Sequence, residues 1–153
     1  MRLGPLSVPE RAAIESWRYP PPYDTYDFDG PIEGEHVGAY EGEELVGYVC
    51  FGEPARVQGM RDEPGLVDVG WGLRPDLTGQ GLGPRLIEAA LALHPGARHR
   101  IAVYAWNERA QRAPAKCGFV HTGERVGDFV LMERQASSAA AAASGASTSP
   151  SAE

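Results

Sequence analysis

The stretch that decides the fold reads LVDVGWGLRPDLTGQGLGP and occupies residues 66–84. Its first eight residues alternate large apolar side chains with small or polar ones, which is typical of a strand. From Gly83 to about His94, apolar residues recur at helical spacing behind Pro84, a residue favoured at the first position of a helix. The sequence therefore predicts a strand, a glycine-rich loop and a helix in direct succession.

The glycine-rich loop has the composition of an anion-binding turn. Gly79, Gly81 and Gly83 remove the Cβ atom at every second position, so the backbone N–H groups at the start of the helix can converge on a phosphate. A P-loop is excluded because Pro84 stands where that motif needs Lys. A dinucleotide fingerprint is excluded because the position that needs its third glycine holds Pro84 or Leu86, depending on the starting glycine. A purely structural turn stays open as the alternative.

The remaining chain predicts a mixed α/β order on both sides of this stretch. Helices are expected at residues 9–17 and 107–117, the second with Pro114 in its path, and an extended loop is expected at the proline run 20–22. Strands are expected at residues 36–40, 45–51, 99–104, 119–124 and 127–133.

Length and composition predict one domain, residues 1–134, followed by a disordered tail at residues 135–153 that consists almost only of small and polar residues. No apolar run approaches the roughly 20 residues that span a bilayer, and no export signal is visible, so a cytoplasmic protein is expected. The only cysteines, Cys50 and Cys117, fit buried thiols better than a disulfide or a cysteine zinc site.

The charge of the chain is negative and unevenly distributed. The formal net charge is −7, and residues 24–53 hold nine carboxylates with no Lys or Arg. This balance argues against nucleic acid and membrane surfaces as partners. The acidic segment has two interpretations: a solvated surface kept for solubility, or a feature that steers a cationic partner toward the protein.

Two motifs in the correct order resemble the GNAT superfamily of N-acetyltransferases. The cofactor loop of that family reads Gln/Arg-x-x-Gly-x-Gly/Ala after a central strand, and residues 78–83 match it with one change. The family's second landmark, Asn-x-x-Ala followed by a helix and Gly-Phe, occurs from Asn107 through Gly118-Phe119. The resemblance covers residues 1–134, and the chain is identified as a small member, like the ribosomal-protein acetyltransferases.

The resemblance implies a single α/β domain with a central, mostly antiparallel twisted sheet of six to seven strands and helices on both faces. A splayed pair of strands would hold acetyl-CoA as co-substrate, and no metal is implied. Asn107 would contact the pantetheine or the thiol end, although it also suits the N-cap of the following helix. The residues expected to bind the cofactor are Trp71, Gly72, Leu73, Thr78, Gly79, Gln80, Gly81, Leu82, Gly83, Pro84 and Asn107.

The chain departs from the family pattern at positions that matter for catalysis. Pro114 replaces the usual Tyr acid, and Ala102 replaces a Glu that serves some members as base. Asp68 on the central strand is the candidate base, with a strand aspartate satisfied by neighbouring donors as the alternative. Tyr104 is the candidate acid, with a core-packing role as the alternative. Backbone N–H groups around Trp71 and Gly72 are expected to stabilise the oxyanion.

The expected activity is acetyl transfer to a primary amine, either an N-terminal α-amine or a small-molecule amine, by direct attack on the thioester. An amine of low pKa suits a site with few bases, because an ε-amine is neutral only about once in 10³ molecules at pH 7. Alternatives are a catalytically degenerate acyl-CoA-binding module and a nucleotide-binding protein. A monomer or homodimer is expected. The residues expected to hold a cationic acceptor are Tyr19, Tyr23, Tyr26 and Asp24.

Overall fold

The computed structural model of the protein describes residues 1–136. The predicted disordered tail therefore lies outside the described residues from position 137 onward. Within residues 1–136, no helix is long and apolar enough to cross a membrane.

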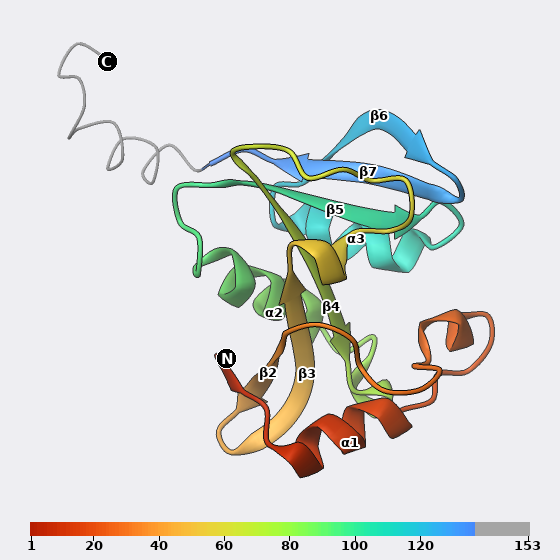
Figure 1. Ribbon diagram of the computed structural model, residues 1–153, viewed down its shortest axis with the longest axis vertical. Helices are drawn as coiled ribbons and strands as arrows, with labels where there is room; N and C mark the ends of the chain where they lie inside the picture. The colour runs from red at the N-terminus through yellow and green to blue at the C-terminus, as the bar shows by residue number, and fades with distance from the viewer. Residues whose placement is uncertain (137–153) are drawn as a thin grey trace, which may run out of the picture.

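Seven strands form one open sheet in the order β1-β2-β3-β4-β5-β7-β6 (Figure 1). Every neighbouring pair is antiparallel except β4 with β5, which is parallel. The predicted mixed α/β fold with a mostly antiparallel sheet is confirmed. In chain order the elements are β1 Arg2–Pro5, α1 Val8–Ser16, η1 Tyr23–Tyr26, β2 His36–Glu41, β3 Glu44–Phe51, η2 Glu53–Ala55, β4 Leu66–Leu73, η3 Pro75–Leu77, α2 Leu82–Leu91, β5 Arg98–Tyr104, α3 Glu108–Lys116, β6 Val120–Val126 and β7 Phe129–Arg134.

Local signals explain most element boundaries. Helix α1 begins with a capping box, in which the Ser7 hydroxyl accepts from the Glu10 N–H and the Glu10 carboxylate accepts from the Ser7 N–H. Helix α3 is capped by Asn107, whose side chain accepts from the Ala110 N–H at 3.0 Å, and the helix continues from Glu108 through Pro114 to Lys116. Strand β1 is absent from the sequence-based prediction, since its four residues become a strand only by pairing with β2.

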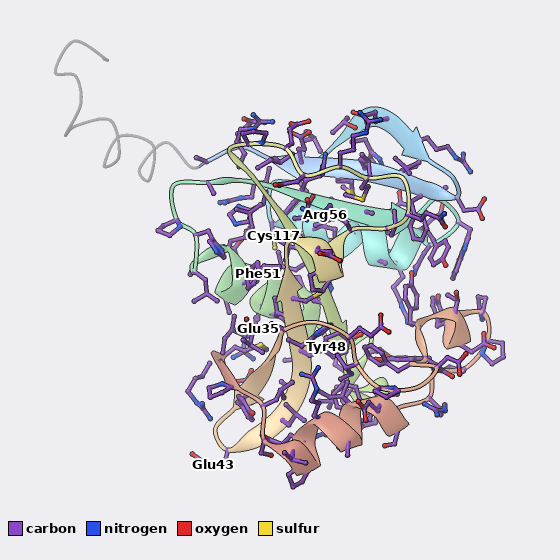
Figure 2. All side chains as sticks on the ribbon, in the orientation of Figure 1. Glu35, Glu43, Tyr48, Phe51, Arg56 and Cys117 are labelled. Atoms are coloured by element: carbon purple, nitrogen blue, oxygen red, sulfur yellow. The ribbon has the colours of Figure 1, made fainter. Side chains whose placement is uncertain are left out.

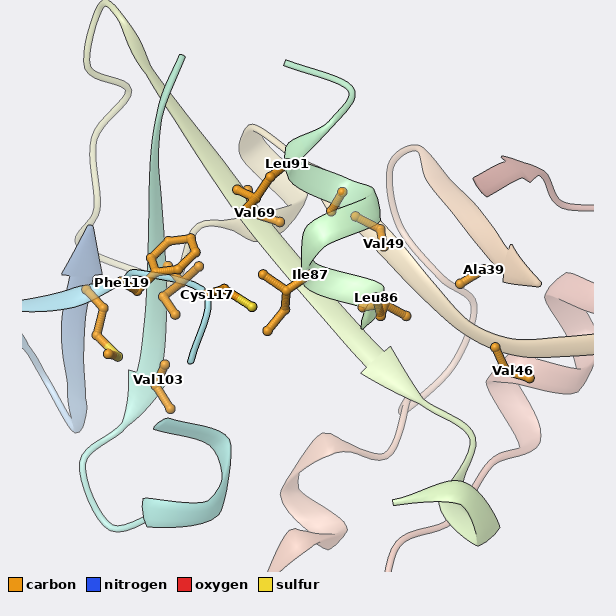
Figure 3. Packing of buried hydrophobic residues seen from close by; sticks show 13 residues of the cluster. Ala39, Val46, Val49, Val69, Leu86, Ile87, Leu91, Val103, Cys117 and Phe119 are labelled. Atoms are coloured by element: carbon orange, nitrogen blue, oxygen red, sulfur yellow. The ribbon is translucent and has the colours of Figure 1, made fainter. Parts of the chain in front are cut away.

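The core lies between helix α2 and the middle of the sheet. Leu86, Ile87 and Leu91 of α2 pack over Val49 of β3 and Val69 of β4 (Figure 3). On β3, a Cβ placed on Gly47 would meet Leu86 of α2, whereas the next residue, Tyr48, contacts Trp17 at the end of α1. Successive strand residues face opposite sides of a sheet, so α1 and α2 cover opposite faces, as predicted.

Strands β4 and β5 run together for only three residues and then separate. Leu66–Asp68 pair with Arg98–Arg100, after which β4 continues against β3 as far as Leu73 and β5 continues against β7 as far as Tyr104. Figure 1 shows β4 running away from β5 across the middle of the molecule. The sheet is therefore divided at its centre into two halves that share one short parallel contact.

Candidate active site at the split in the sheet

A cavity of about 480 Å³ lies where β4 and β5 have separated. Its lining comes from the second half of β4, the glycine loop, one face of α3, the end of β5 and the aromatic loop that contains η1. Most residues expected to bind a cofactor or an acceptor are brought together there. The predicted site residues that line it are Tyr19, Tyr23, Tyr26, Trp71, Gly72, Leu73, Thr78, Gly79, Gly81, Gly83, Pro84, Tyr104 and Asn107.

The backbone of β4 presents alternate residues to this cavity. The Gly52 N–H donates to the Asp68 carbonyl and the Arg74 N–H donates to the Val46 carbonyl. Because hydrogen-bonded pairs alternate along an antiparallel ladder, Gly70 and Gly72 also direct their backbone groups toward β3. The backbone groups of Trp71 and Leu73 consequently face the split.

A side-chain contact agrees with this assignment, because the Tyr19 hydroxyl reaches into the split and donates to the Leu73 carbonyl at 2.5 Å. The sequence-based expectation named both Trp71 and Gly72 as oxyanion donors. Of these two N–H groups, the register turns only that of Trp71 toward the split, since the Gly72 N–H is directed to Tyr48 of β3.

The glycine loop leads into the N-terminus of α2 with open space beside it. Gly79 and Gly81 have φ values of +77° and +81°, and a Cβ built on either would meet nothing within 4 Å. A Cβ on Gly83 would lie 3.2 Å from the Cβ of Ala113, so this glycine lets α2 approach α3. The loop thus combines left-handed backbone, free space and helix N–H groups, which suits a phosphate.

Two residues of the predicted cofactor loop have side chains that hydrogen-bond within the loop itself. The Thr78 hydroxyl donates to the Pro75 carbonyl at 3.0 Å, and the Gln80 amide donates to the Asp76 carbonyl at 3.0 Å. Gln80 and Leu82 are not among the residues that line the cavity. The side chains of Thr78 and Gln80 therefore stabilise the turn, and of these two only Thr78 also lines the cavity.

Three cations of α3 line the cavity, and the sequence analysis did not single them out. Arg109, Arg112 and Lys116 are spaced i, i+3 and i+7, which places them on one face of the helix. Within residues 1–136 none of them has a carboxylate within salt-bridge distance, in contrast to Arg74 and Arg100. Their spacing, read together with the glycine loop, is the signal that would have revealed this positive strip.

An aromatic wall closes the cavity on the side of α1. The Asn107 amide donates to the Tyr26 hydroxyl at 2.8 Å, and the Tyr104 hydroxyl lies 3.1 Å from the Thr25 hydroxyl. The Arg109 guanidinium lies 3.9 Å from the centre of the Tyr23 ring. These contacts fasten the η1 loop to the start of α3, so residues about 80 positions apart form one wall. Burial raises the pKa of Tyr26, which keeps its phenol protonated.

Tyr104 serves mainly as part of this wall. Its ring packs 4.2 Å from the Phe129 ring and 5.4 Å from the Trp106 ring, measured between centroids. Its hydroxyl is engaged by Thr25. The arrangement agrees with the packing role that was the alternative to an acid at this position.

Asp24 does not line the cavity, and neither does any other carboxylate of residues 1–136. Asp24 is exposed; Glu41 contacts the N-terminal amine and Arg85, and Glu44 contacts Arg74. Figure 2 shows Glu43 at the tip of the β2–β3 hairpin, directed away from the body of the protein. These placements fit a solvated surface, the first of the two interpretations, and none of the carboxylates of residues 24–53 lines the cavity.

Asp68, the predicted base, also lies outside the cavity lining. Its side chain is 1% exposed and lies at the joined end of β4 and β5. It accepts from Arg100 Nε at 2.7 Å and from Arg56 Nη1 at 3.0 Å. Both guanidinium groups donate to the carboxylate oxygens, and charge-assisted hydrogen bonds of this kind are strong. This placement favours the alternative, a structural aspartate satisfied by its neighbours, over the predicted general base.

Known proteins share this architecture. The structure of aminoglycoside acetyltransferase AAC(6')-Ib with paromomycin and acetyl-CoA is 23% identical, with a TM-score of 0.56 over 77% of this chain and 70% of that one. The same enzyme with coenzyme A gives 24% identity and a TM-score of 0.55 over 65% of each chain. The N-acetyltransferase PseH of Campylobacter jejuni with acetyl coenzyme A gives 15% and 0.53 over 67% of each. These likenesses show the fold, and the chain spans about two thirds of the length of the structures it matches.

Sequence comparison identifies the family. No curated protein matches the chain in sequence. The profile of the Acetyltransferase (GNAT) family, however, matches residues 6–119, which is well over half of the chain and includes β4, the glycine loop, α2 and α3. The protein therefore belongs to the GNAT acetyltransferase family.

Proposed function

We propose that the protein is an N-acetyltransferase that moves the acetyl group of acetyl-CoA to a primary amine. The observation that carries this proposal is the conjunction at one cavity of three features: outward-facing backbone groups on β4, an open glycine loop at the start of α2, and a strip of cations on α3. Each feature matches a different part of acetyl-CoA.

The polar parts of acetyl-CoA fit the far end of this cavity. The diphosphate would accept from the N–H groups around Gly79 and Gly81. Arg112 and Lys116 would offset its negative charge. The pantetheine arm carries amides that can pair with the backbone groups of Trp71 and Leu73 as a further strand would, which leads the thioester toward the aromatic wall.

The chemical step needs an uncharged amine, a stabilised oxyanion and a departing thiolate. The nitrogen lone pair attacks the thioester carbonyl, the oxyanion accepts from the Trp71 N–H, and the carbon–sulfur bond then breaks. Removal of one such donor costs about 10² to 10³ in rate in other enzymes. Because this donor belongs to the backbone, it does not depend on the side chains lost at Ala102 and Pro114.

The surroundings of the acceptor favour a neutral amine without a carboxylate base. The cavity is walled by aromatic rings, it includes Arg109, and no carboxylate of residues 1–136 lines it. Both burial and a nearby positive charge lower the pKa of an amine. We therefore propose an acceptor whose amine already has a low pKa, such as an N-terminal α-amine or a small-molecule amine on an apolar body.

The same reasoning argues against a polycationic acceptor. Aminoglycosides are bound by the AAC(6')-Ib structures, but several ammonium groups would find no carboxylate partner in the cavity of this chain within residues 1–136. The acceptor proposed here therefore carries one amine and little other positive charge, and steering of a cation by the acidic segment stays a prediction.

The experiment that tests the proposal follows free thiol while the purified protein is incubated with acetyl-CoA and a panel of amines. The panel contains a dipeptide with a free α-amine, an arylalkylamine, an N-terminally blocked lysine peptide and an aminoglycoside. Thiol release with the first two, faster than with the last two by tenfold or more, supports the proposal. Binding of acetyl-CoA without thiol release for any amine would instead favour the degenerate binding module, for which Pro114 and the buried Asp68 are the motivating observations.

A further inference from the structure

We propose that Tyr48 is the catalytic proton relay of this acetyltransferase, a role that rests on the proposed function. Tyr48 stands on β3, outside both motifs of the family resemblance, and its side chain lines the cavity. Other members of the family carry a tyrosine acid on α3 at the position that Pro114 occupies in this chain. Tyr48 would supply the phenol hydroxyl that is missing there.

The position of the Tyr48 hydroxyl is fixed against the open half of β4. Tyr48 is the register partner of Gly72, and a Cβ built on Gly72 would lie 2.5 Å from Cε1, Cζ and Oη of the tyrosine. The ring therefore folds directly over the glycine, and only a residue without a side chain fits beneath it. The hydroxyl therefore lies over Gly72. The preceding residue in the sequence is Trp71, whose N–H faces the split and is the proposed oxyanion donor.

Packing holds the Tyr48 ring in this place. Ring centroids of Trp17, Phe28 and His36 lie 6.2, 5.6 and 5.7 Å from its own. Figure 2 shows Tyr48 at the centre of the molecule, between the ribbons of β3 and β4 and the segment that carries α1. Because the ring is packed on several sides, its side-chain conformation is restricted and its hydroxyl is held in one position, as a proton-transfer group requires.

The Tyr48 hydroxyl also differs from those of three other cavity tyrosines in having no hydrogen-bond partner among residues 1–136. Those of Tyr19, Tyr26 and Tyr104 are engaged by the Leu73 carbonyl, the Asn107 amide and the Thr25 hydroxyl. Burial raises the pKa of Tyr48, so its oxygen carries a proton at neutral pH.

The Tyr48 hydroxyl would carry the proton that the amine must lose to the sulfur that must gain one. Attack of the neutral amine gives an intermediate whose nitrogen is positively charged and whose carbonyl oxygen is negative. The nitrogen gives one proton to the Tyr48 oxygen while that oxygen gives its own proton to the sulfur. The carbon–sulfur bond breaks as the carbonyl re-forms, so the products are a neutral amide and a free thiol, and Tyr48 ends as it began.

The test compares Tyr48→Phe, which keeps the ring and removes the hydroxyl, with Tyr40→Phe on the neighbouring strand β2. The Tyr40 hydroxyl contacts Glu10 and the Pro5 carbonyl, away from the cavity. We expect Tyr48→Phe to lower kcat about 10² to 10³-fold, in the range of general acid–base catalysis, with the KM for acetyl-CoA changed less than threefold. We expect Tyr40→Phe to keep wild-type kcat. Equal kcat for Tyr48→Phe and wild type would overturn the relay while leaving the acetyltransferase in place.

A binding measurement decides the same question without turnover. If Tyr48 hydrogen-bonds the sulfur, the wild type should bind CoA about fivefold more tightly than desulfo-CoA, which lacks that atom, as expected for one hydrogen bond. Tyr48→Phe should bind the two equally. Equal affinities in the wild type would contradict the relay. Failure of the wild type to bind either compound would overturn the proposed function itself, and the relay with it.

Discussion

The two halves of strand β4 have opposite chemistry. The joined half, Leu66–Asp68, pairs with β5, carries the buried carboxylate of Asp68 and is fixed by Arg56 and Arg100. The open half, residues 69–73, has glycines at alternate positions and turns backbone groups toward a cavity. Where β4 and β5 separate, the hydrogen bonds between the two strands are absent. We therefore expect the pairing and ion pairs of the joined half to hold the two strands together. The comparison predicts that changes in the joined half act on stability and changes in the open half on activity.

The largest effect is expected from Asp68→Asn. Removal of this charge leaves the Arg100 side chain, 7% exposed, with only the more distant carboxylate of Glu63, at 4.0 Å, and breaking a buried ion pair typically costs about 3 to 5 kcal/mol. Urea denaturation of wild type and variant measures the difference in the free energy of unfolding. The matched control is Asp62→Asn, which removes an 80% exposed partner of Arg56 and should cost less than about 1 kcal/mol. A stable Asp68→Asn protein with altered pH dependence of turnover would restore Asp68 as the base.

This pair of residues also shows what the sequence can and cannot supply. The strand at residues 66–73 and the glycine loop after it were predicted, because alternation of residue types and alternate glycines are local patterns, whereas the split beside the strand was expected only from the resemblance to the GNAT family. The environment of Asp68 was not, because Arg56 lies in a loop and Arg100 lies 32 positions along the chain. Tyr48 was not predicted for the same reason. Its ring lies over Gly72 on the neighbouring strand, and only the strand register shows this contact.

The second effect concerns His99, which lies at the joined end on the β5 side, opposite Val67. It is 1% exposed, and burial, reinforced by His94 and Arg134, lowers its pKa from 6.5 to about 4. Between pH 6.5 and 4 the His99 imidazole binds a proton in the unfolded chain but not in the folded chain. The free energy of unfolding should therefore fall as the pH decreases. The expected loss is about 1.4 kcal/mol for each pH unit, or about 3 kcal/mol in all.

The measurement is the free energy of unfolding at several pH values for wild type and His99→Leu. The variant should lose most of the slope between pH 6.5 and 4, whatever its absolute stability. His121→Gln, at an exposed position of β6, should keep the wild-type slope. An unchanged slope in His99→Leu would show that other groups cause the acid sensitivity.

The third effect is expected in the open half, from Gly72→Ala. The added methyl group would overlap the Tyr48 ring at 2.5 Å, and overpacking of this kind costs about 1 to 3 kcal/mol. Turnover should fall more than stability alone explains, because the ring must leave its place. Gly70→Ala, whose Cβ would meet Cys50 Sγ at 3.0 Å, should cost less on both measures. Adding Tyr48→Ala to Gly72→Ala should recover the stability lost to the clash, and additive losses would contradict the contact.

The smallest effect is expected from Arg112→Ala, since this side chain is exposed and has no carboxylate within salt-bridge distance among residues 1–136. Its removal should leave the free energy of unfolding unchanged and weaken CoA binding about fivefold, the equivalent of about 1 kcal/mol. Because the contact is an exposed charge pair, the difference from wild type should shrink as salt rises from 0.05 to about 0.5 M. Arg125→Ala on β6, away from the cavity, controls for loss of overall positive charge. Equal weakening by both variants would mean that net charge, and not the strip on α3, attracts the cofactor. Weakening by Arg112→Ala alone would place the phosphates of CoA against α3 and therefore beside the open half of β4.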